Sequence, residues 1–225
     1  YSNKKDWRLK HKASEYGYTL YCLRGNHEMR PSNVEGMKLV YDENIKGEVY
    51  TEEEFPLIRY FVDGGEYEIN GYKVLAIGGA YSVDKFYRLE RGFHWFKDEQ
   101  LSFEEFEAIH KKVFGKTYDL VFTHTAPFSY EPTDLFLDFI DQTKVDVSTP
   151  IWLDGIKNAI TFDVWCFGHY HADRIEAPKF EQFFASYDTI ENIMNRWLRF
   201  KIDKTFDRKL SCGPKMIEVI NNVEV

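Results

Sequence analysis

The sequence predicts a single α/β domain with a central sheet and helices outside it. Its 225 residues are enough for one substantial core, and 44% hydrophobic and 29% charged residues are typical of a soluble globular protein. Short apolar runs alternate along the chain with helical patterns, which favours mixed α/β architecture. No internal repeat or low-complexity linker divides the sequence, so we expect one domain.

The first third of the chain predicts a helix, a strand, a second helix and a hairpin. Residues 4–17 have a basic, helical pattern, and residues 18–23 (YTLYCL) are aromatic and β-branched enough for a strand. Pro31 and Ser32 are helix-start signals, so a helix is expected to begin there. Residues 66–79 contain Asn-Gly between two alternating runs, which predicts a β-hairpin.

Residues 101–114 give the clearest helical pattern. Ser102 and Glu105 have the spacing of a capping box. Leu101 and Phe106 have the spacing of a hydrophobic staple across the same helix start. These signals predict where the helix begins as well as its existence.

The second half continues the alternation of strands and helices. Residues 118–124 and 163–169 are apolar runs too compact for helices, so we predict two buried strands. Residues 134–140 (DLFLDFI) are expected to form an amphipathic core helix, with a lid over the site as the alternative. Asp188 and Glu191 form a second capping pattern, which predicts another helix.

Charge and cysteine content limit the classes of function. The chain has 29 basic and 37 acidic residues, a net charge of −8 that argues against non-specific binding to nucleic acids or anionic membranes. No apolar stretch is long enough to span a membrane. Cys22, Cys166 and Cys212 lack the spacing of a disulfide framework, which predicts a reducing, cytoplasmic location. The chain begins at Tyr1 rather than Met, which leaves a removed signal peptide as an alternative.

Three of the predicted apolar strands end in polar corners, with the sequences LYCLRGNHE, DLVFTHTAP and VWCFGHYHAD. Ligands of open α/β sheets lie beyond the carboxyl ends of the strands, so we expect the corner side chains to gather there. An extended backbone would point the last two histidines of the third corner to the same side, spaced to hold two ions about 3.5–4 Å apart. A single histidine after a strand is usually a capping group, but five such groups at one edge indicate a site. They are Asn26, His27, His124, His169 and His171.

The order GNHE, TH after a strand, and GHYH resembles the calcineurin-like metallophosphoesterases over roughly residues 1–190. LRGNHE is similar to the corresponding stretch of Ser/Thr phosphoprotein phosphatases, whereas HTAP and FGHYHADR are closer to bacterial relatives of unassigned substrate. The resemblance implies a metallophosphoesterase-type β-sandwich flanked by helices in residues 1–200, and a tail of unclear structure in residues 201–225. The family's Asp-x-His and Gly-Asp motifs are absent from this chain. We therefore expect the fold to lack its N-terminal strand-helix-strand.

The resemblance also implies a role for each corner residue. Asn26, His124 and His169 would ligate one metal ion, and His171 would ligate a second. His27 would face the substrate phosphate and assist the leaving oxygen, either as a general acid or as a cation. Amide and imidazole ligands suit two divalent transition-metal ions drawn from Mn, Fe, Zn or Co rather than Ca.

Residues beside the corners are candidates for substrate binding. Arg24 is expected to reach a phosphate, with a salt bridge as the alternative. Tyr81, Asp84 and Arg88 follow the predicted hairpin and would line the cleft, although Asp84 and Arg88 also have the i,i+4 spacing of a helix pair. Glu28 would orient the first corner, with a solvated side chain as the alternative.

The implied activity is hydrolysis of a phosphomonoester or phosphodiester by a metal-bound hydroxide at a two-metal site. The phosphorylated substrate is open between a phosphoprotein, a nucleotide and a cyclic nucleotide, and the acidic charge argues against a dedicated nuclease. The rival is a non-catalytic binding module that retains the fold but only part of the metal site. Because His171 is the only recognisable ligand of the second ion, we expect residues 1–225 alone to be inactive and poorly stable. The oligomeric state stays open.

Overall fold

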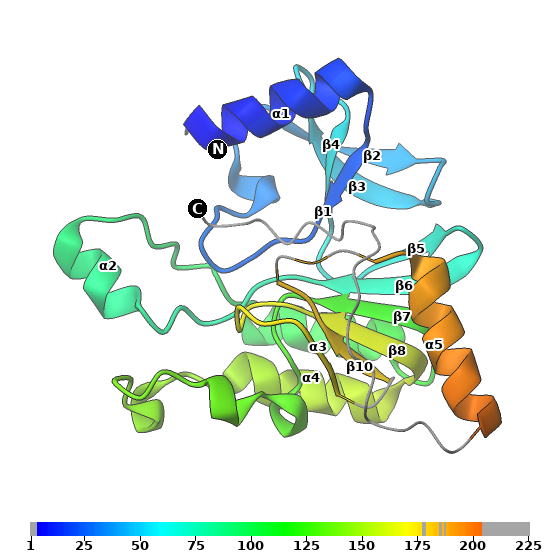
Figure 1. The fold of residues 1–225 in the computed structure, drawn as a ribbon. Coiled ribbons are helices and arrows are strands. Elements are labelled where there is room, and N and C mark those ends of the chain that lie inside the picture. Colours follow the sequence, from blue (N-terminus) through cyan, green and yellow to red (C-terminus); the bar gives the residue numbers. More distant parts are fainter. Residues whose placement is uncertain (1–3, 177–178, 185, 187, 204–225) are drawn as a thin grey trace.

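The structure is a computed structural model that describes residues 4–176, 179–184, 186 and 188–203. It confirms a mixed α/β fold, but two sheets replace the single central sheet expected from the residues (Figure 1). The smaller sheet has the strand order β1-β4-β3-β2. Its strands are β1 (Leu20–Cys22), β2 (Met37–Asp42), β3 (Gly47–Glu52) and β4 (Ile58–Phe61).

The larger sheet has the order β5-β6-β7-β8-β10-β9, and its neighbours from β6 to β10 run parallel. Its strands are β5 (Gly65–Ile69), β6 (Tyr72–Ile77), β7 (Thr117–Thr123), β8 (Thr161–Phe167), β9 (Arg174–Glu176) and β10 (Phe180–Gln182). The helices are α1 (Lys4–Tyr16), α2 (Lys85–Arg91), α3 (Phe103–Val113), α4 (Ser148–Ala159) and α5 (Ile190–Asp203).

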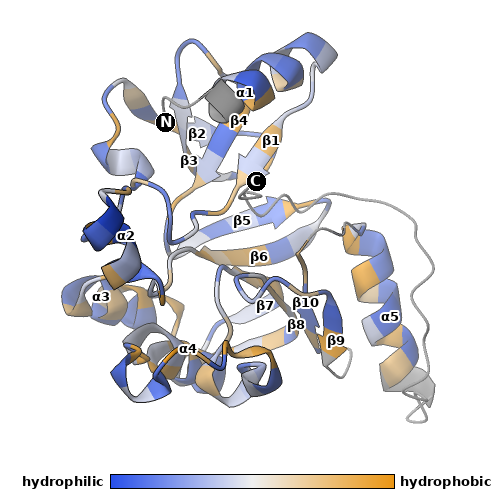
Figure 2. Ribbon diagram, turned by 60° about the vertical axis from the view of Figure 1, so that its left-hand side comes forward, coloured by the Kyte–Doolittle hydropathy of each residue, from blue (hydrophilic) through white to orange (hydrophobic). Residues whose placement is uncertain are grey.

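Both faces of the larger sheet are covered, because successive strand residues point to opposite sides. On β8, Trp165 packs in the cluster shared with α3 and α4, whereas Val164 packs in the cluster shared with α5 and the smaller sheet. Helix α1 covers the other side of the smaller sheet through Ala13. The layers in Figure 1 therefore run from α1 through the two sheets to α3 and α4. Helix α5 carries apolar and polar residues along its length, consistent with one face on the sheet (Figure 2).

Two strong local signals are confirmed. The Asn70-Gly71 turn joins β5 to β6, and both residues have the positive φ (53° and 82°) that a tight hairpin turn of this type requires. At the start of α3, Ser102 Oγ accepts from Glu105 N at 3.3 Å while Glu105 Oε2 accepts from Ser102 N at 2.7 Å. The capping box therefore forms as its spacing predicts.

The helix expected at Pro31 and Ser32 is wrong. The chain makes one 3-10 turn at Pro31–Asn33, turns at Gly36 with φ 83°, and then enters β2. Six consecutive residue pairs join β2 to β3. Tertiary strand pairing thus overrides a local start signal, and the sequence analysis missed strands β2, β3 and β4.

The core helix expected at residues 134–140 is also wrong. This stretch contains only a 3-10 turn at Thr133–Leu135, and the side chains of Leu137 and Phe139 are 48% and 80% exposed. Asp134 is instead paired with Arg174 Nη2 at 2.6 Å, which attaches the segment to β9. An apolar pattern here does not correspond to burial.

The predicted C-terminal helix is present as α5, but its capping differs from the expected pattern. Thr189 Oγ1, not Asp188, accepts from the backbone of the first turn, at 2.7 Å from Asn192 N. The Glu191 carboxylate accepts from Asn70 Nδ2 at 3.2 Å.

The structure describes two of the three cysteines and only the first residues of the C-terminal tail. Cys22 and Cys166 are buried thiols, as expected for cysteines inside apolar strands. Cys212 and most of the tail at residues 201–225 lie outside the described residues. None of the helices in the described part of the chain is both long enough and apolar enough to cross a membrane.

Candidate functional site

The three polar corners meet because backbone hydrogen bonds link them one to the next. Gly79 N, just beyond β6, donates to Arg24 O in the β1 corner at 2.8 Å. His124 N after β7 donates to Ile77 O at 3.2 Å, and Gly168 N after β8 donates to His124 O at 3.0 Å. The ends of β1, β6, β7 and β8 are therefore joined into one edge.

Asn26, His124 and His169 lie together at this edge. Asn26 Oδ1 is 2.9 Å from His124 Nε2 although the two residues are 98 positions apart. The rings of His124 and His169 have centroids 5.1 Å apart. A Cβ at Gly25 would lie 3.3 Å from His124 Cε1, so a glycine here permits the close approach of the two corners. His171 is more exposed, with its ring stacked 4.7 Å from that of Phe184.

The extended backbone expected for His169 and His171 is wrong. Both have positive φ, 71° and 53°, in the left-handed region that residues with a Cβ seldom adopt. Such a conformation costs on the order of 1–3 kcal/mol per residue, and strained residues of this kind cluster at functional sites. Their two rings are therefore placed by a tight turn after β8 rather than by strand alternation.

The buried imidazoles of His124 and His169 have lowered pKa values, which favours their neutral forms. Burial holds the pKa of His124 well below its ordinary value, and the neighbouring His169 lowers the pKa further. Burial, together with His27 and His171, lowers the pKa of His169 to about 4. A neutral imidazole has one ring nitrogen with the free lone pair that a metal ligand needs; where His124 Nε2 faces Asn26 Oδ1 it donates to that oxygen, so an ion bound there would displace its proton.

His27 is held between Asp84 and Arg88, which both come from the α2 region. His27 Nε2 is 3.3 Å from Asp84 Oδ1, and Arg88 Nη2 contacts His27 Nδ1. Because arginine can only donate, Nδ1 must accept and Nε2 must carry the proton. Burial lowers the pKa of His27, and the charge of Arg88 lowers it further while Asp84 opposes the shift.

The i,i+4 pair of Asp84 and Arg88 forms, with Arg88 Nε 2.7 Å from Asp84 Oδ2. Both side chains of this pair also contact His27. The two residues therefore form the i,i+4 pair and lie at the candidate site as well. Asp84, a cleft-lining candidate from the sequence with the helix pair as the alternative, thus contacts both His27 and Arg88.

Arg24 does not present its guanidinium to solvent. The side chain is 1% exposed, and Nε and Nη2 donate to Asp63 Oδ2 at 3.1 and 2.9 Å. Nη1 donates to Glu99 O at 2.7 Å, and Nη2 also approaches Gly78 O at 3.3 Å. Arg24 therefore joins the segments that carry Asp63, Gly78 and Glu99. Each of its side-chain nitrogens already has a partner, so none is left for the phosphate contact expected from the sequence.

Glu28 has an orienting role in the same corner. Its Oε1 accepts from the backbone N–H of Gly25, three residues earlier, and so closes the turn that carries Asn26 and His27.

Gly79→Ala is expected to lower the free energy of unfolding by about 2–4 kcal/mol, through backbone strain at φ 87° and overlap in a packed corner. An added Cβ would lie 2.4 Å from Glu99 O and 2.6 Å from Arg24 Nη2. Gly92→Ala is the matched control, because Gly92 has φ 70° but nothing within 4 Å of an added Cβ. Urea denaturation of both variants measures the difference, and equal losses would contradict the tight fit around Arg24.

Sequence reasoning missed Ser82 and Glu99, which lie directly behind Asn26. Asn26 Nδ2 is 3.0 Å from Ser82 Oγ, and Ser82 Oγ is 2.6 Å from Glu99 Oε2. Ser82 N also donates to Glu99 Oε1 at 3.0 Å. Ser82 follows an apolar strand into a Gly-Gly loop, a signal that was available, whereas nothing local marks Glu99.

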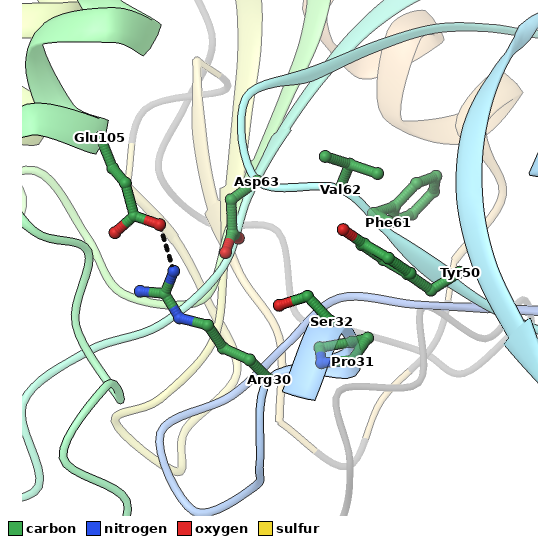
Figure 3. Close-up of a pocket in the computed structure, with 8 residues that line it drawn as sticks. All are labelled: Arg30, Pro31, Ser32, Tyr50, Phe61, Val62, Asp63 and Glu105. Carbon is green, nitrogen blue, oxygen red and sulfur yellow. Dashed lines mark hydrogen bonds and ion pairs between the residues drawn. The ribbon is translucent and has the colours of Figure 1, made fainter. Parts of the chain in front are cut away.

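A pocket lies beside the β1 corner and is separate from the histidines (Figure 3). Arg30 in its wall is paired with Glu105, and Asp63 with Arg24, so the charged groups satisfy one another. The pocket is lined by Arg30, Pro31, Ser32, Tyr50, Phe61, Val62, Asp63 and Glu105.

The donor set fits a transition-metal ion in part. No three His, Cys, Asp or Glu side chains among the described residues stand in an arrangement that holds a metal. Asn26 adds an amide oxygen next to His124, 2.9 Å from its Nε2. Two neutral imidazoles and an amide oxygen are donors that Mn, Fe, Zn and Co accept.

A scan of the chain against protein-family models found no match, and neither did searches of curated proteins and of solved structures.

Proposed function

We propose that this chain carries part of the active site of a metal-dependent phosphoesterase that hydrolyses a phosphomonoester or phosphodiester. The observation that supports the proposal is the convergence of Asn26, His124 and His169 from three separate strand ends as neutral donors. His27 lies beside them with a protonated Nε2. Metal ligands next to a proton donor are the components that hydrolysis of a phosphoester uses.

Each residue has a task in this proposal. Asn26, His124 and His169 would hold one divalent transition-metal ion, and His171 would contribute to a second. Bound divalent ions polarise phosphoryl oxygens and make bound water acidic. His27, neutral with its proton on Nε2, would donate a hydrogen bond from Nε2 to the leaving oxygen and keep that proton, while water protonates the departing oxygen.

Arg88 would bind a phosphoryl oxygen from the opposite side. Its Nη2 contacts His27 Nδ1 and its Nη1 approaches His94 O at 3.4 Å, so it would reach a phosphate through a second N–H of these groups or by releasing one of them. Arginine is always charged and donates several N–H bonds in a plane, which suits phosphate. Asp84 would hold both His27 and Arg88 in place before substrate binds.

Wild-type protein is expected to bind Mn²⁺ or Zn²⁺, and His124→Ala is expected to weaken that binding at least about tenfold, because it removes a donor at the centre of the cluster. Isothermal titration with each metal measures the effect. His110→Ala on α3 is the control, since this histidine lies outside the cluster.

Activity is assayed on the product of the complete reading frame, with p-nitrophenyl phosphate and its bis ester. Metal-dependent turnover that His124→Ala abolishes would support the proposal. Metal binding without turnover of either ester would favour the non-catalytic binding module. A folded wild-type protein that binds neither metal would overturn the metal site.

A further inference from the structure

A buried chain of hydrogen bonds ends on Asn26. It runs from Glu99 through Ser82 to the Asn26 amide, and the three side chains are 2%, 0% and 9% exposed. Glu99 comes from the loop before α3 and Ser82 from the loop after β6, so two distant segments meet behind one side chain. A buried carboxylate placed against a serine needs an explanation beyond packing, because burying a charge is costly unless it is hydrogen-bonded.

The direction of each hydrogen bond follows from donor chemistry. An ionised carboxylate only accepts, so Ser82 Oγ must donate its single proton to Glu99 Oε2. Ser82 Oγ can then only accept from Asn26, and the Asn26 atom that faces it must be Nδ2. The oxygen of the amide is thereby forced toward His124.

We infer that Ser82 and Glu99 are positioning residues that fix the orientation of the Asn26 amide and present Oδ1 to the metal position. Without them the amide is free to turn by 180° and place Nδ2, which cannot bind a cation, against His124. The metal-binding part of this inference rests on the proposed function, whereas the amide orientation does not.

Two substitutions separate orientation from packing. Ser82→Ala removes the hydroxyl that receives Asn26 Nδ2. Glu99→Gln keeps the shape but puts a donor toward Ser82 Oγ, so that the hydroxyl proton turns to Asn26 and the amide reverses. A role confined to packing would leave Glu99→Gln without effect on Asn26.

Ser129→Ala is the matched control. Ser129 donates to Asp154 through both N and Oγ, at 3.0 and 2.7 Å, as Ser82 does to Glu99, but this pair lies between the 3-10 turn after β7 and helix α4. The control therefore removes an equivalent hydroxyl–carboxylate hydrogen bond at another place.

The first measurement is hydrogen exchange of the Asn26 side-chain amide by ¹⁵N NMR on metal-free protein. Wild type and Ser129→Ala are expected to show the same protected Nδ2 protons at the same chemical shifts. Ser82→Ala is expected to lose that protection, and Glu99→Gln to move the Nδ2 shifts because the partner of Nδ2 changes from Ser82 to His124. Nδ2 protection and shifts that match wild type in both site variants overturn the inference, whatever the metal result. If Ser82→Ala fails to fold, Glu99→Gln decides alone.

The second measurement is titration with Mn²⁺ alone. Residues behind a metal ligand typically contribute about 10–100-fold to affinity, so Ser82→Ala and Glu99→Gln are expected to weaken binding by that factor and Ser129→Ala to leave it unchanged. Unchanged affinity in both site variants overturns the positioning role. If wild type binds no Mn²⁺ while its Asn26 amide is protected, the proposed function fails and the orientation of Asn26 stands.

Discussion

His169→Ala is expected to lower metal content and phosphoesterase turnover together, whereas His27→Ala should keep the metal and lower kcat by about 10²–10⁴-fold. The reason is a difference in surroundings. His169 faces His124 with its ring centroid 5.1 Å away, inside the group of donors. His27 has its two nitrogens engaged with Asp84 and Arg88 instead.

Elemental analysis and steady-state kinetics of the two variants measure this difference on the product of the complete reading frame. His110→Ala serves as the control for the loss of any histidine, because it lies on α3 away from the corners. Circular dichroism checks that each variant is folded, which matters for His169 because alanine must also adopt φ 71°. If both substitutions strip the metal equally, the role assigned to His27 is wrong.

The elements predicted correctly from the sequence are those with strong local signals. The Asn70-Gly71 turn and the capping box of α3 need only neighbouring residues, so they form as predicted. Strand β2 has a competing local signal at Pro31, and pairing with β3 decides its structure. A single sequence does not display that pairing, since the register depends on a segment that was not recognised as a strand.

In the candidate site, too, the sequence indicates what depends on neighbouring residues and not what depends on contacts with distant ones. The five corner residues were marked as candidates because each follows an apolar strand; the parallel pairing of β7 with β8 places His124, His169 and His171 together, and the hydrogen bond from Gly79 N to Arg24 O attaches the β1 corner with Asn26 and His27. Arg24 has a different role because Asp63 and two carbonyls, all distant in the sequence, surround its guanidinium. The turn that gives His169 and His171 their positive φ likewise leaves no mark in the residue pattern.

Arg196→Met is expected to lower the free energy of unfolding by about 3–5 kcal/mol, because it leaves a buried carboxylate without its partner. Glu181 on β10 is 0% exposed, and Arg196 on α5 binds both of its oxygens, at 3.0 and 2.5 Å. Methionine keeps an apolar side chain similar to the aliphatic part of arginine. The loss in free energy of unfolding therefore comes from removing the guanidinium charge. Urea denaturation at pH 7 measures it.

Arg174→Met is the matched control for this substitution. Arg174 also binds both oxygens of one carboxylate, at 2.9 and 2.6 Å, but Asp134 is 63% exposed and an exposed pair contributes about 0–1 kcal/mol. Equal losses in the two variants would contradict the buried-charge explanation. The double change of Arg196→Met with Glu181→Leu is expected to recover the part of the loss that comes from Glu181, whereas Asp188, 14% exposed and also paired with Arg196, still lacks its partner.

The loss in Arg196→Met should also shrink as the pH falls. Burial raises the pKa of Glu181 above its ordinary value even in wild type, although the hydrogen bonds with Arg196 oppose the shift. Without Arg196 these hydrogen bonds are lost, so the pKa of Glu181 in the folded state rises further. A carboxyl whose pKa is higher when folded takes up its proton first in the folded state, so the folded variant gains relative stability from neutral pH down to the unfolded-state pKa of about 4.3. A deficit that stays constant between pH 7 and pH 5 would mean that lost packing, rather than the unpaired carboxylate, destabilises the variant.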